Sequence, residues 1–121
     1  MKYIKLFELW DESGIKFVES ENSIPQFRSY YIIDNGTKVG TLDLSFLYSN
    51  LKSDEIEIAG LIINPAFQRQ NLGRKIIESL WVEYPNINKI YLQSIEESKG
   101  FWKKMGAVES QRENYWEINR R

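Results

Sequence analysis

Between Leu61 and Lys75 the chain reads LIINPAFQRQNLGRK, an apolar run that ends in Asn-Pro and leads through a polar loop into a helical pattern. The first turn of a helix presents unpaired N–H groups and the positive end of the helix dipole, so this helix start is suited to an anion. Gly73 lets a phosphate approach the backbone closely, and Arg69, Arg74 and Lys75 add positive charge. On these residues alone, a plain strand–loop–helix connection with solvated basic side chains is an equal alternative. The stretch contains neither a P-loop nor a GxGxxG motif.

The flanking sequence predicts a mixed α/β (α+β) sheet with helices packed against it. Asp34-Asn35-Gly36 predicts a hairpin turn between strands at 30–33 and 38–47, and residues 55–63 predict the next strand. Apolar residues four positions apart then predict a helix over 71–84, which Pro85 stops. A strand at 89–93 follows, and Ser94 with Glu97 forms a capping box for a helix that buries Phe101, Trp102 and Met105.

The two ends of the chain are predicted as follows. Gly106 suits the left-handed position after the second helix, and two short strands follow near 107–111 and 114–119. Residues 2–10 predict a first strand, whereas residues 11–27 leave room for at most one short helix.

Length and composition bound the function. With 121 residues the chain is long enough for one domain, which we expect to span residues 1–121. Sixteen basic and seventeen acidic side chains leave a net charge of −1, which argues against a nucleic-acid or membrane-surface binder.

The chain has no Cys and no His, which excludes disulfides, thiol nucleophiles and Ser-His-Asp triads and predicts no metal site. Acid–base chemistry then falls to carboxylates, Tyr, Lys or water. Charged residues interrupt the first apolar residues, and no apolar run approaches the ~20 residues of a membrane span, so we expect a cytoplasmic protein.

Residues 68–73 resemble a known cofactor-binding motif. The acyl-CoA-binding motif of the GNAT superfamily of N-acetyltransferases has the pattern (Gln/Arg)-x-x-Gly-x-(Gly/Ala), and this chain has Gln68-Arg69-Gln70-Asn71-Leu72-Gly73. The run 61–65 is similar to the family's fourth strand with its terminal proline, and 98–107 is similar to its second signature, a helix with an aromatic pair followed by Gly. The resemblance covers roughly residues 28–111 and implies a single GNAT-like domain, with a mostly antiparallel sheet flanked by helices and a reduced N-terminal helical region.

The resemblance implies acetyl-CoA as cosubstrate and an amine acceptor, either a small molecule or a protein. Acetyl-CoA carries a long amide arm and a diphosphate, so it needs an exposed strand edge with an anion site beside it. The resemblance implies that the backbone of 61–63 pairs with the pantetheine arm and that N–H groups of 69–74 hold the pyrophosphate. The implied cofactor-binding residues are Leu61, Ile62, Ile63, Gln68, Arg69, Gln70, Asn71, Leu72, Gly73 and Arg74.

A catalytic base is needed because an alkylamine with a pKa of ~10 is mostly protonated at neutral pH and must lose a proton before it attacks a thioester. Many members of the family use a glutamate on the fourth strand, directly or through water. Glu57 stands eleven positions before Gln68, which matches the base position of the histone-type members. The alternatives are a strand glutamate without a catalytic role and the neighbouring Glu55 as the base.

Three residues depart from the family pattern. Asn71 replaces the first glycine of the motif, and asparagine is one of the few other residues that tolerate a left-handed backbone. Trp102 stands where many members have a tyrosine that protonates the leaving thiolate, and Ile95 replaces a frequent asparagine. Either water or another tyrosine, Tyr115 or Tyr84, then supplies that proton, or catalysis is lost.

Two other functions stay open. The chain could be a catalytically weak GNAT-like module that binds CoA or a partner, or an interaction domain that binds no CoA, which would make the ordered match of two motifs a coincidence. The family usually places two helices between its first two strands, whereas only the segment 11–27 is available here. The acceptor cleft is therefore expected to be more open, or to be completed by the second subunit of a homodimer. The sequence does not name the acceptor.

Overall fold

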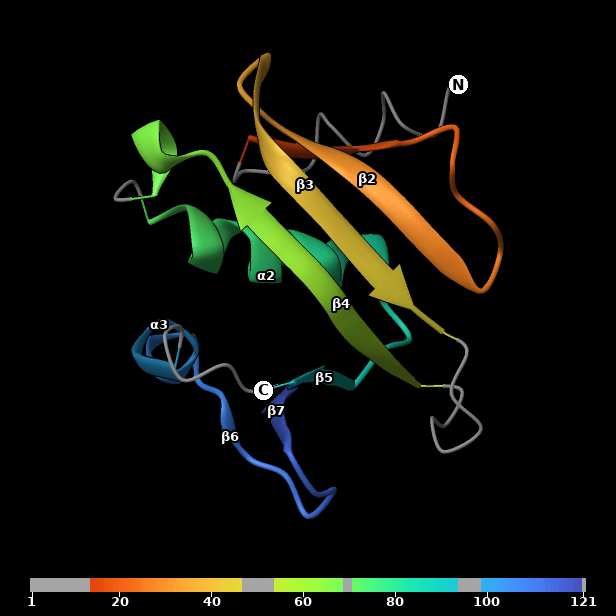
Figure 1. Cartoon of the computed structure of the whole chain (residues 1–121), viewed down its shortest axis with the longest axis vertical. Helices are drawn as coiled ribbons and strands as arrows, with labels where there is room; N and C mark the ends of the chain where they lie inside the picture. Colours follow the sequence, from red (N-terminus) through yellow and green to blue (C-terminus); the bar gives the residue numbers. More distant parts are fainter. Residues whose placement is uncertain (1–13, 47–53, 69–70, 94–98, 121) are drawn as a thin grey trace.

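The structure is a computed structural model that describes residues 14–46, 54–68, 71–93 and 99–120 (Figure 1). The described strands form one sheet of seven strands in the order β1-β2-β3-β4-β5-β7-β6. Strands β4 and β5 run parallel and the other neighbouring pairs run antiparallel, so the sheet is mixed and mostly antiparallel, as predicted. The strands are β1 (Ile15–Glu19), β2 (Phe27–Asp34), β3 (Thr37–Ser45), β4 (Glu55–Ile63), β5 (Lys89–Gln93), β6 (Val108–Glu109) and β7 (Tyr115–Asn119); the helices are the 3-10 turn η1 (Pro65–Phe67), α2 (Leu72–Glu83) and α3 (Lys99–Lys104).

The β2–β3 hairpin forms where the sequence predicts it. Asn35 and Gly36 have φ angles of 50° and 87°, and two successive positive φ angles are what a tight type I′ turn requires. Pairing extends from the turn to Phe27 opposite Ser45, so β2 begins earlier than the predicted strand at 30–33.

Strand β1 differs from the prediction for residues 11–27, which allowed at most one short helix. The strand pairs antiparallel with β2 along its whole length. Ile15 and Phe17 are 1% and 9% exposed and alternate with less buried neighbours, which is the period of a strand with one face in the core. The sequence does not predict this strand, because it has only five residues, of which two point into the core, and turn residues flank it.

The remaining elements lie near their predicted ranges. Strands β4 and β5 have the predicted bounds, and α2 covers 72–83 of the predicted 71–84. Gly106 follows α3 with a φ of 90°, as predicted, and β6 and β7 are shorter than the predicted strands. The predicted strand at 2–10 and the capping box of Ser94 with Glu97 lie outside the described residues.

Helix α2 lies against one face of the sheet and forms the second layer of the molecule (Figure 1). Its residues Leu72, Ile76 and Leu80 are almost fully buried, one helical turn apart, and form a stripe toward the sheet. The sheet side of this core includes Leu42, Leu44, Ile56, Ile58, Ile90, Leu92 and Ile118. In the described parts of the chain, no helix is both long and apolar enough to cross a membrane.

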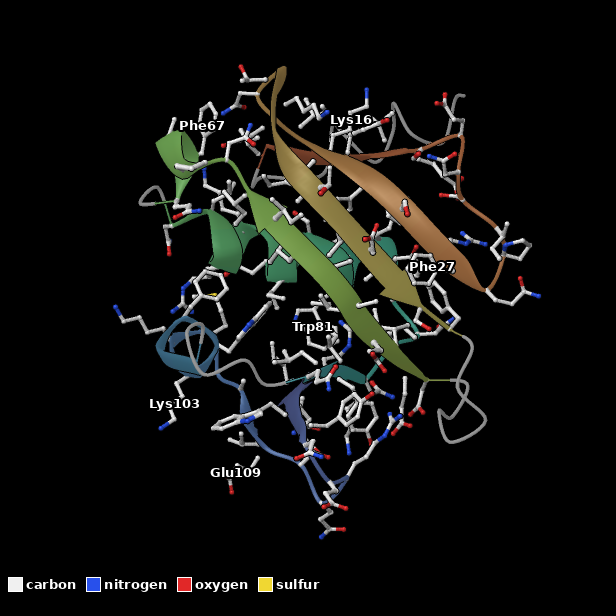
Figure 2. All side chains as sticks on the ribbon, viewed as in Figure 1. Lys16, Phe27, Phe67, Trp81, Lys103 and Glu109 are labelled. Carbon is white, nitrogen blue, oxygen red and sulfur yellow. The ribbon has the colours of Figure 1, made fainter. Side chains whose placement is uncertain are left out.

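The sheet's other face is polar at one end, because the residues of β4, β5 and β7 that alternate with the core residues are mostly charged or hydroxylated. Figure 2 places Phe67 of η1 toward one end of the molecule and Glu109 of β6 toward the other. The register of β7 with β5 puts the β6–β7 turn beyond the carboxyl end of β5, because Tyr115 lies opposite Gln93.

Candidate active site

Strands β4 and β5 pair over only part of β4. Residues 55–58 pair in register with residues 89–92, after which β4 continues through Ala59–Ile63 beyond its pairing with β5. On its other side β4 pairs with β3, where the register shifts so that Leu44 faces Ile58 and Asp43 faces Gly60. Ala59 is thus an extra residue, a β-bulge, and a bulge bends and twists its strand. The two strands part at this bulge.

A cleft of about 500 Å³ opens where the strands part. Its walls come from β4, from the end of β5 and from α3, and Gln68 lies at its edge near the loop before α2. The lining residues are Glu57, Ile58, Ala59, Gly60, Leu61, Ile63, Gln68, Leu92, Gln93, Phe101 and Trp102. The freed edge of β4 offers backbone N–H and C=O groups to an extended ligand in the manner of an added strand.

The residues predicted to meet the pantetheine arm lie on this edge. Leu61 and Ile63 line the cleft, whereas the side chain of Ile62 is 68% exposed and lies outside the cleft lining. Gln68 donates a hydrogen bond from Nε2 to the carbonyl oxygen of Ile63 at 2.9 Å, which ties the loop after η1 to the end of β4.

Asn71, Gly73 and Arg74 are predicted loop residues with a defined local geometry. Asn71 adopts the left-handed conformation, with φ 57° and ψ 26°, and α2 begins at Leu72. Gly73 is buried in the first turn, against the ring of Phe101. The guanidinium of Arg74 donates a hydrogen bond to the carbonyl oxygen of Lys104 at 3.1 Å and so caps the end of α3. Arg69 and Gln70, the other predicted residues of this loop, lie outside the described residues.

Glu57 lines the cleft and stands next to the last β4–β5 pair, Ile58 with Leu92. Its side chain is only 4% exposed, and its Oε1 atom has no hydrogen-bond partner among the residues that the structure describes. Burial raises the pKa of Glu57, while the charge of Arg112 and a hydrogen bond from the Tyr115 hydroxyl act in the opposite direction. A buried carboxyl with a raised pKa is suited to take up a proton near neutral pH.

Glu55, the alternative base, occupies a different position. It lies on the same face two residues earlier, within the fully paired part of β4, and is 9% exposed. The hydroxyl of Tyr91 lies 3.5 Å from its Oε2 atom, at the outer limit of a hydrogen bond. Glu55 is outside the lining of the cleft, whereas Glu57 is part of it.

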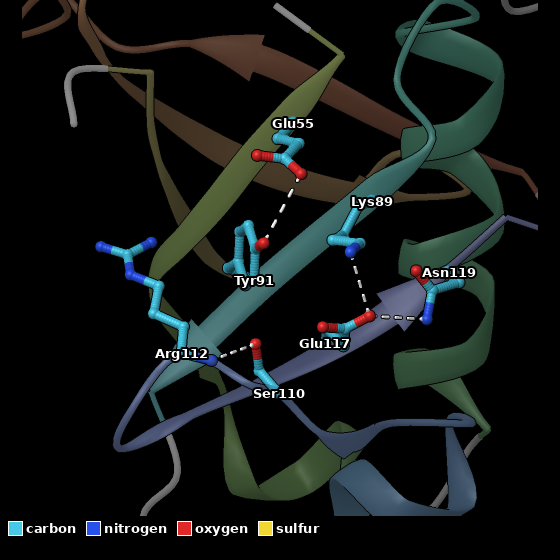
Figure 3. Close-up of polar contacts among 7 residues, drawn as sticks. All are labelled: Glu55, Lys89, Tyr91, Ser110, Arg112, Glu117 and Asn119. Atoms are coloured by element: carbon cyan, nitrogen blue, oxygen red, sulfur yellow. Dashed lines mark hydrogen bonds and ion pairs between the residues drawn. The ribbon is translucent and has the colours of Figure 1, made fainter. Parts of the chain in front are cut away.

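A polar network covers this face of β5 and β7 (Figure 3). Lys89 pairs with Glu117 at 3.2 Å, and Asn119 donates a hydrogen bond to the same carboxylate at 2.9 Å. Burial acts to raise the pKa of Glu117, but hydrogen bonds from Asn119, Lys89 and Ser110 outweigh it and hold that pKa below its usual value.

Arg112 and Tyr91 are the residues near Glu57 that the sequence did not single out. The alternation of polar and apolar residues in β5 and β7 was a signal that could have placed Tyr91 on the polar face. No local pattern could have placed Arg112, which comes from the turn between β6 and β7.

The aromatic residues discussed for thiolate protonation lie in different places. Trp102 is 9% exposed and contributes to both the core and the cleft wall. Its ring packs edge-on against the Phe101 ring, with 4.9 Å between the ring centres. The hydroxyl groups of Tyr84 and Tyr30 lie 2.6 Å apart, and burial together with this bond raises the pKa of Tyr84 far above its usual value. Such a phenol is a poor acid, and Tyr84 lies outside the cleft lining.

Comparisons with known proteins show the family and the fold of this chain. The model of the Acetyltransferase (GNAT) family matches residues 3–107, and no curated protein matches the sequence. Among solved structures, GCN5 of Tetrahymena has a TM-score of 0.63 at 17% identity, over 79% of this chain and 69% of that one. YhhK of E. coli, solved by NMR bound to coenzyme A, has a TM-score of 0.64 at 17% identity, over 97% of this chain and 88% of that one.

A third structure, a chimera of the spermidine N-acetyltransferase SpeG of Vibrio cholerae and hSSAT, has a TM-score of 0.60 at 19% identity, over 78% of this chain and 68% of that one. At these identities the structures establish the fold, and the family model, which matches most of the chain, establishes the family. The chain belongs to the GNAT family of acetyltransferases.

Proposed function

We propose that this protein transfers the acetyl group of acetyl-CoA to a primary amine, with Glu57 as the base. The observation that carries the proposal is the parting of β4 and β5 at the Ala59 bulge, where a cleft opens that is lined in part by the buried carboxyl group of Glu57. The proposed base Glu57, the free edge of β4 and the start of α2 thus come in this order along the chain. The acceptor is a small molecule or a protein amine.

The cofactor's arm is long enough to require several contacts along this path. In the proposal, the backbone edge at 61–63 pairs with the amides of pantetheine, and Gln68 borders the arm. The N–H groups from residue 69 to residue 74 bind the pyrophosphate at the positive end of α2. Asn71 supports this assignment because its left-handed backbone lies directly before the first turn of α2. The coenzyme A in the YhhK structure supports the same ligand.

The reaction then proceeds in balanced steps. Glu57 takes one proton from the ammonium group of the acceptor, directly or through a water molecule, and leaves a neutral amine. The amine nitrogen attacks the thioester carbonyl carbon, a C–N bond forms, and the C–S bond breaks as the electron pair returns to sulfur. The CoA thiolate takes up a proton from water or from Tyr115, and the second amine proton leaves to solvent. The products are an N-acetyl amide and CoA.

A protein that binds CoA but turns over slowly is the second candidate. The observation that favours it is the burial of Trp102 in the position where many family members have a proton-donating tyrosine. An indole N–H cannot supply that proton. In this case the cleft binds the cofactor while acetyl transfer to amines stays close to the rate of the uncatalysed reaction.

Two measurements separate these candidates. Isothermal titration with acetyl-CoA and with CoA tests the site, and we expect dissociation constants in the micromolar range. An amine panel containing a polyamine, free amino acids and a lysine peptide then tests turnover. Glu57→Gln should lower kcat by a factor of about 10² or more while leaving acetyl-CoA binding within twofold.

Glu55→Gln is the matched control, since it removes a neighbouring carboxylate from the same face and should retain most of the turnover. Binding without turnover in the wild-type protein favours the second candidate. Absence of binding at millimolar cofactor contradicts both.

A further inference from the structure

Arg112 is the described cation whose charge acts on Glu57, and it reaches this position from the β6–β7 turn. Figure 3 shows its side chain leaving the turn and running past Tyr91. The guanidinium carbon lies 4.0 Å from the centre of the Tyr115 ring and 5.3 Å from the centre of the Tyr91 ring. The two rings meet edge to face with 6.3 Å between their centres, and the guanidinium makes cation–π contacts with both.

The turn that carries Arg112 is held by its own hydrogen bonds. The backbone N–H of Arg112 donates a hydrogen bond to Oγ of Ser110 at 3.1 Å. The backbone N–H of Tyr115 donates one to the backbone carbonyl oxygen of Arg112, also at 3.1 Å. Asn114 takes up the left-handed conformation, with a φ of 64°, that closes the turn. The turn therefore fixes the backbone of Arg112, and the two rings contact its guanidinium.

The groups that face this region come from every neighbouring strand. On β4 and β5, Tyr91 lies directly opposite Glu57 in the register, and Glu55 lies two residues before Glu57. Lys89 of β5 forms an ion pair with Glu117 of β7 at 3.2 Å, whereas the charge of Arg112 acts on Glu57. The charged and titratable groups around Glu57 are Asp43 of β3, Glu55 of β4, Lys89 and Tyr91 of β5, Arg112 of the turn, and Tyr115 and Glu117 of β7.

We propose that Arg112 is a positioning residue for acetyl transfer, which keeps the buried carboxylate of Glu57 ionised and aimed into the cleft at neutral pH. The inference rests on the proposed function, because it assigns Arg112 a role through the base. A carboxylate that is 4% exposed loses most of its hydration and needs a nearby charge or donor to stay ionised. Arg112 supplies the charge, and the Tyr115 hydroxyl supplies the donor.

The arrangement has a further consequence for the reaction. When Glu57 takes up the proton of the acceptor, its attraction to Arg112 disappears, so the guanidinium limits how strongly the base holds that proton. A base with a pKa close to the working pH both accepts and releases protons efficiently. Burial raises the pKa of Glu57 and the charge of Arg112 acts against that rise, so the guanidinium limits how far the pKa moves above its usual value.

The direct test follows the titration of Glu57 itself, without any ligand. Carbon-13 NMR of side-chain carboxyl groups, assigned with Glu57→Gln, gives the midpoint in the wild type, Arg112→Gln, Arg112→Lys and Tyr115→Phe. We expect the midpoint to rise by about one pH unit in Arg112→Gln and to rise less in Tyr115→Phe. Arg112→Lys should restore a midpoint close to the wild type, because it keeps the charge. Lys103→Gln, which removes a cation that lies over Trp116, is the matched control and should leave the midpoint unchanged.

A second readout is the pH dependence of kcat/KM with an amine found in the panel. The acid limb should move to higher pH in Arg112→Gln, with a loss of about tenfold at a pH below both midpoints and recovery at high pH. A change in KM with an unmoved pH profile would assign Arg112 to acceptor binding and overturn the inference, as would an unmoved NMR midpoint. Should Arg112→Gln fail to fold, Arg112→Met provides the same test, because it keeps an apolar chain over the Tyr91 and Tyr115 rings and removes the charge.

Failure of this inference can be distinguished from failure of the proposed function. If Glu57→Gln retains full turnover, the base assignment is wrong whatever the NMR midpoints are. If Glu57→Gln loses turnover and Arg112→Gln leaves both readouts unmoved, the base assignment stands and only the role of Arg112 is wrong.

Discussion

Gly73 in the first turn of α2 faces the ring of Phe101 of α3 so closely that a Cβ atom at position 73 would stand 2.4 Å from its Cζ atom. Carbon atoms of packed side chains approach to about 3.5–4.0 Å, so glycine is required for the two helices to meet in this way. Phe101 also lines the cleft. The contact therefore couples the loop before α2 to the cleft wall, in addition to the approach of a phosphate that the sequence predicts for Gly73.

Gly73→Ala is expected to destabilise the protein by about 1–3 kcal/mol and to weaken CoA binding, since the Phe101 ring must move away from the new methyl group. Urea unfolding and calorimetric titration measure the two effects. The double variant with Phe101→Leu should recover much of the stability, because the smaller side chain relieves the clash. If the two changes are simply additive, the contact between these residues is not the cause.

Asn71 is the position where the family motif has its first glycine. Because asparagine tolerates its φ of 57°, Asn71→Gly should change stability by less than about 0.5 kcal/mol, while the affinity for CoA rises several-fold as the side chain no longer narrows the approach. Asn35→Gly is the matched control, since Asn35 has a φ of 50° in the distant β2–β3 turn. It should leave CoA binding unchanged. Equal affinity of the wild type and Asn71→Gly would show that the asparagine does not obstruct the cofactor.

Arg120 joins the end of α2 to the last strand. Its guanidinium donates hydrogen bonds to the carbonyl oxygens of Ile87 at 2.7 Å and of Trp81 and Tyr84 at 3.1 Å each, and it lies over the Trp81 ring at 4.7 Å. Arg120→Ala should therefore lower the free energy of unfolding by about 3 kcal/mol without changing the dissociation constant for acetyl-CoA.

The matched control for Arg120 is Arg74→Ala, which removes an exposed guanidinium that binds the single carbonyl of Lys104 and should lower the free energy of unfolding by less than about 1 kcal/mol. Arg120→Lys should recover less than half of the loss, since an ammonium group lacks the planar fork that bridges several carbonyls. Equal losses in the two alanine variants would mean that the three carbonyl contacts of Arg120 stabilise the fold no more than the single contact of Arg74.

How far the sequence predicts the structure depends on the range of the interactions involved. The bounds of β4 and β5, the turn at Asn35 and the start of α2 follow from local patterns, and the structure confirms them. Glu57 lies where β4 and β5 separate, and this position depends on the bulge of β4 opposite β3. The position of Arg112 depends on the register of β5 with β7. Such long-range pairings leave no periodic signal in the chain, so the family resemblance could suggest Glu57 but nothing suggested Arg112.

Glu57 should also oppose the stability of the fold at the pH where it would act as a base. Its pKa in the folded state is raised, chiefly by burial, so between the unfolded and folded pKa values the folded state binds more protons than the unfolded state. Stability therefore falls as pH rises through that window, and the loss stays at higher pH. Glu57→Gln removes the buried charge. The difference in melting temperature, variant minus wild type, should therefore be more positive at pH 8 than at pH 4.

Glu117 provides the opposite case, because hydrogen bonds from Asn119, Lys89 and Ser110 outweigh burial and lower its folded pKa. Its ionised form contributes stability that is present above the unfolded pKa and lost as pH falls through the folded one. Glu117→Gln should therefore lower the melting temperature at pH 8 more than at pH 4. Melting curves of both variants and the wild type at the two pH values test whether the two substitutions change the melting temperature in these opposite directions. A Glu57→Gln variant that is less stable than the wild type at pH 8 would mean that Arg112 and Tyr115 more than compensate the burial of the carboxylate.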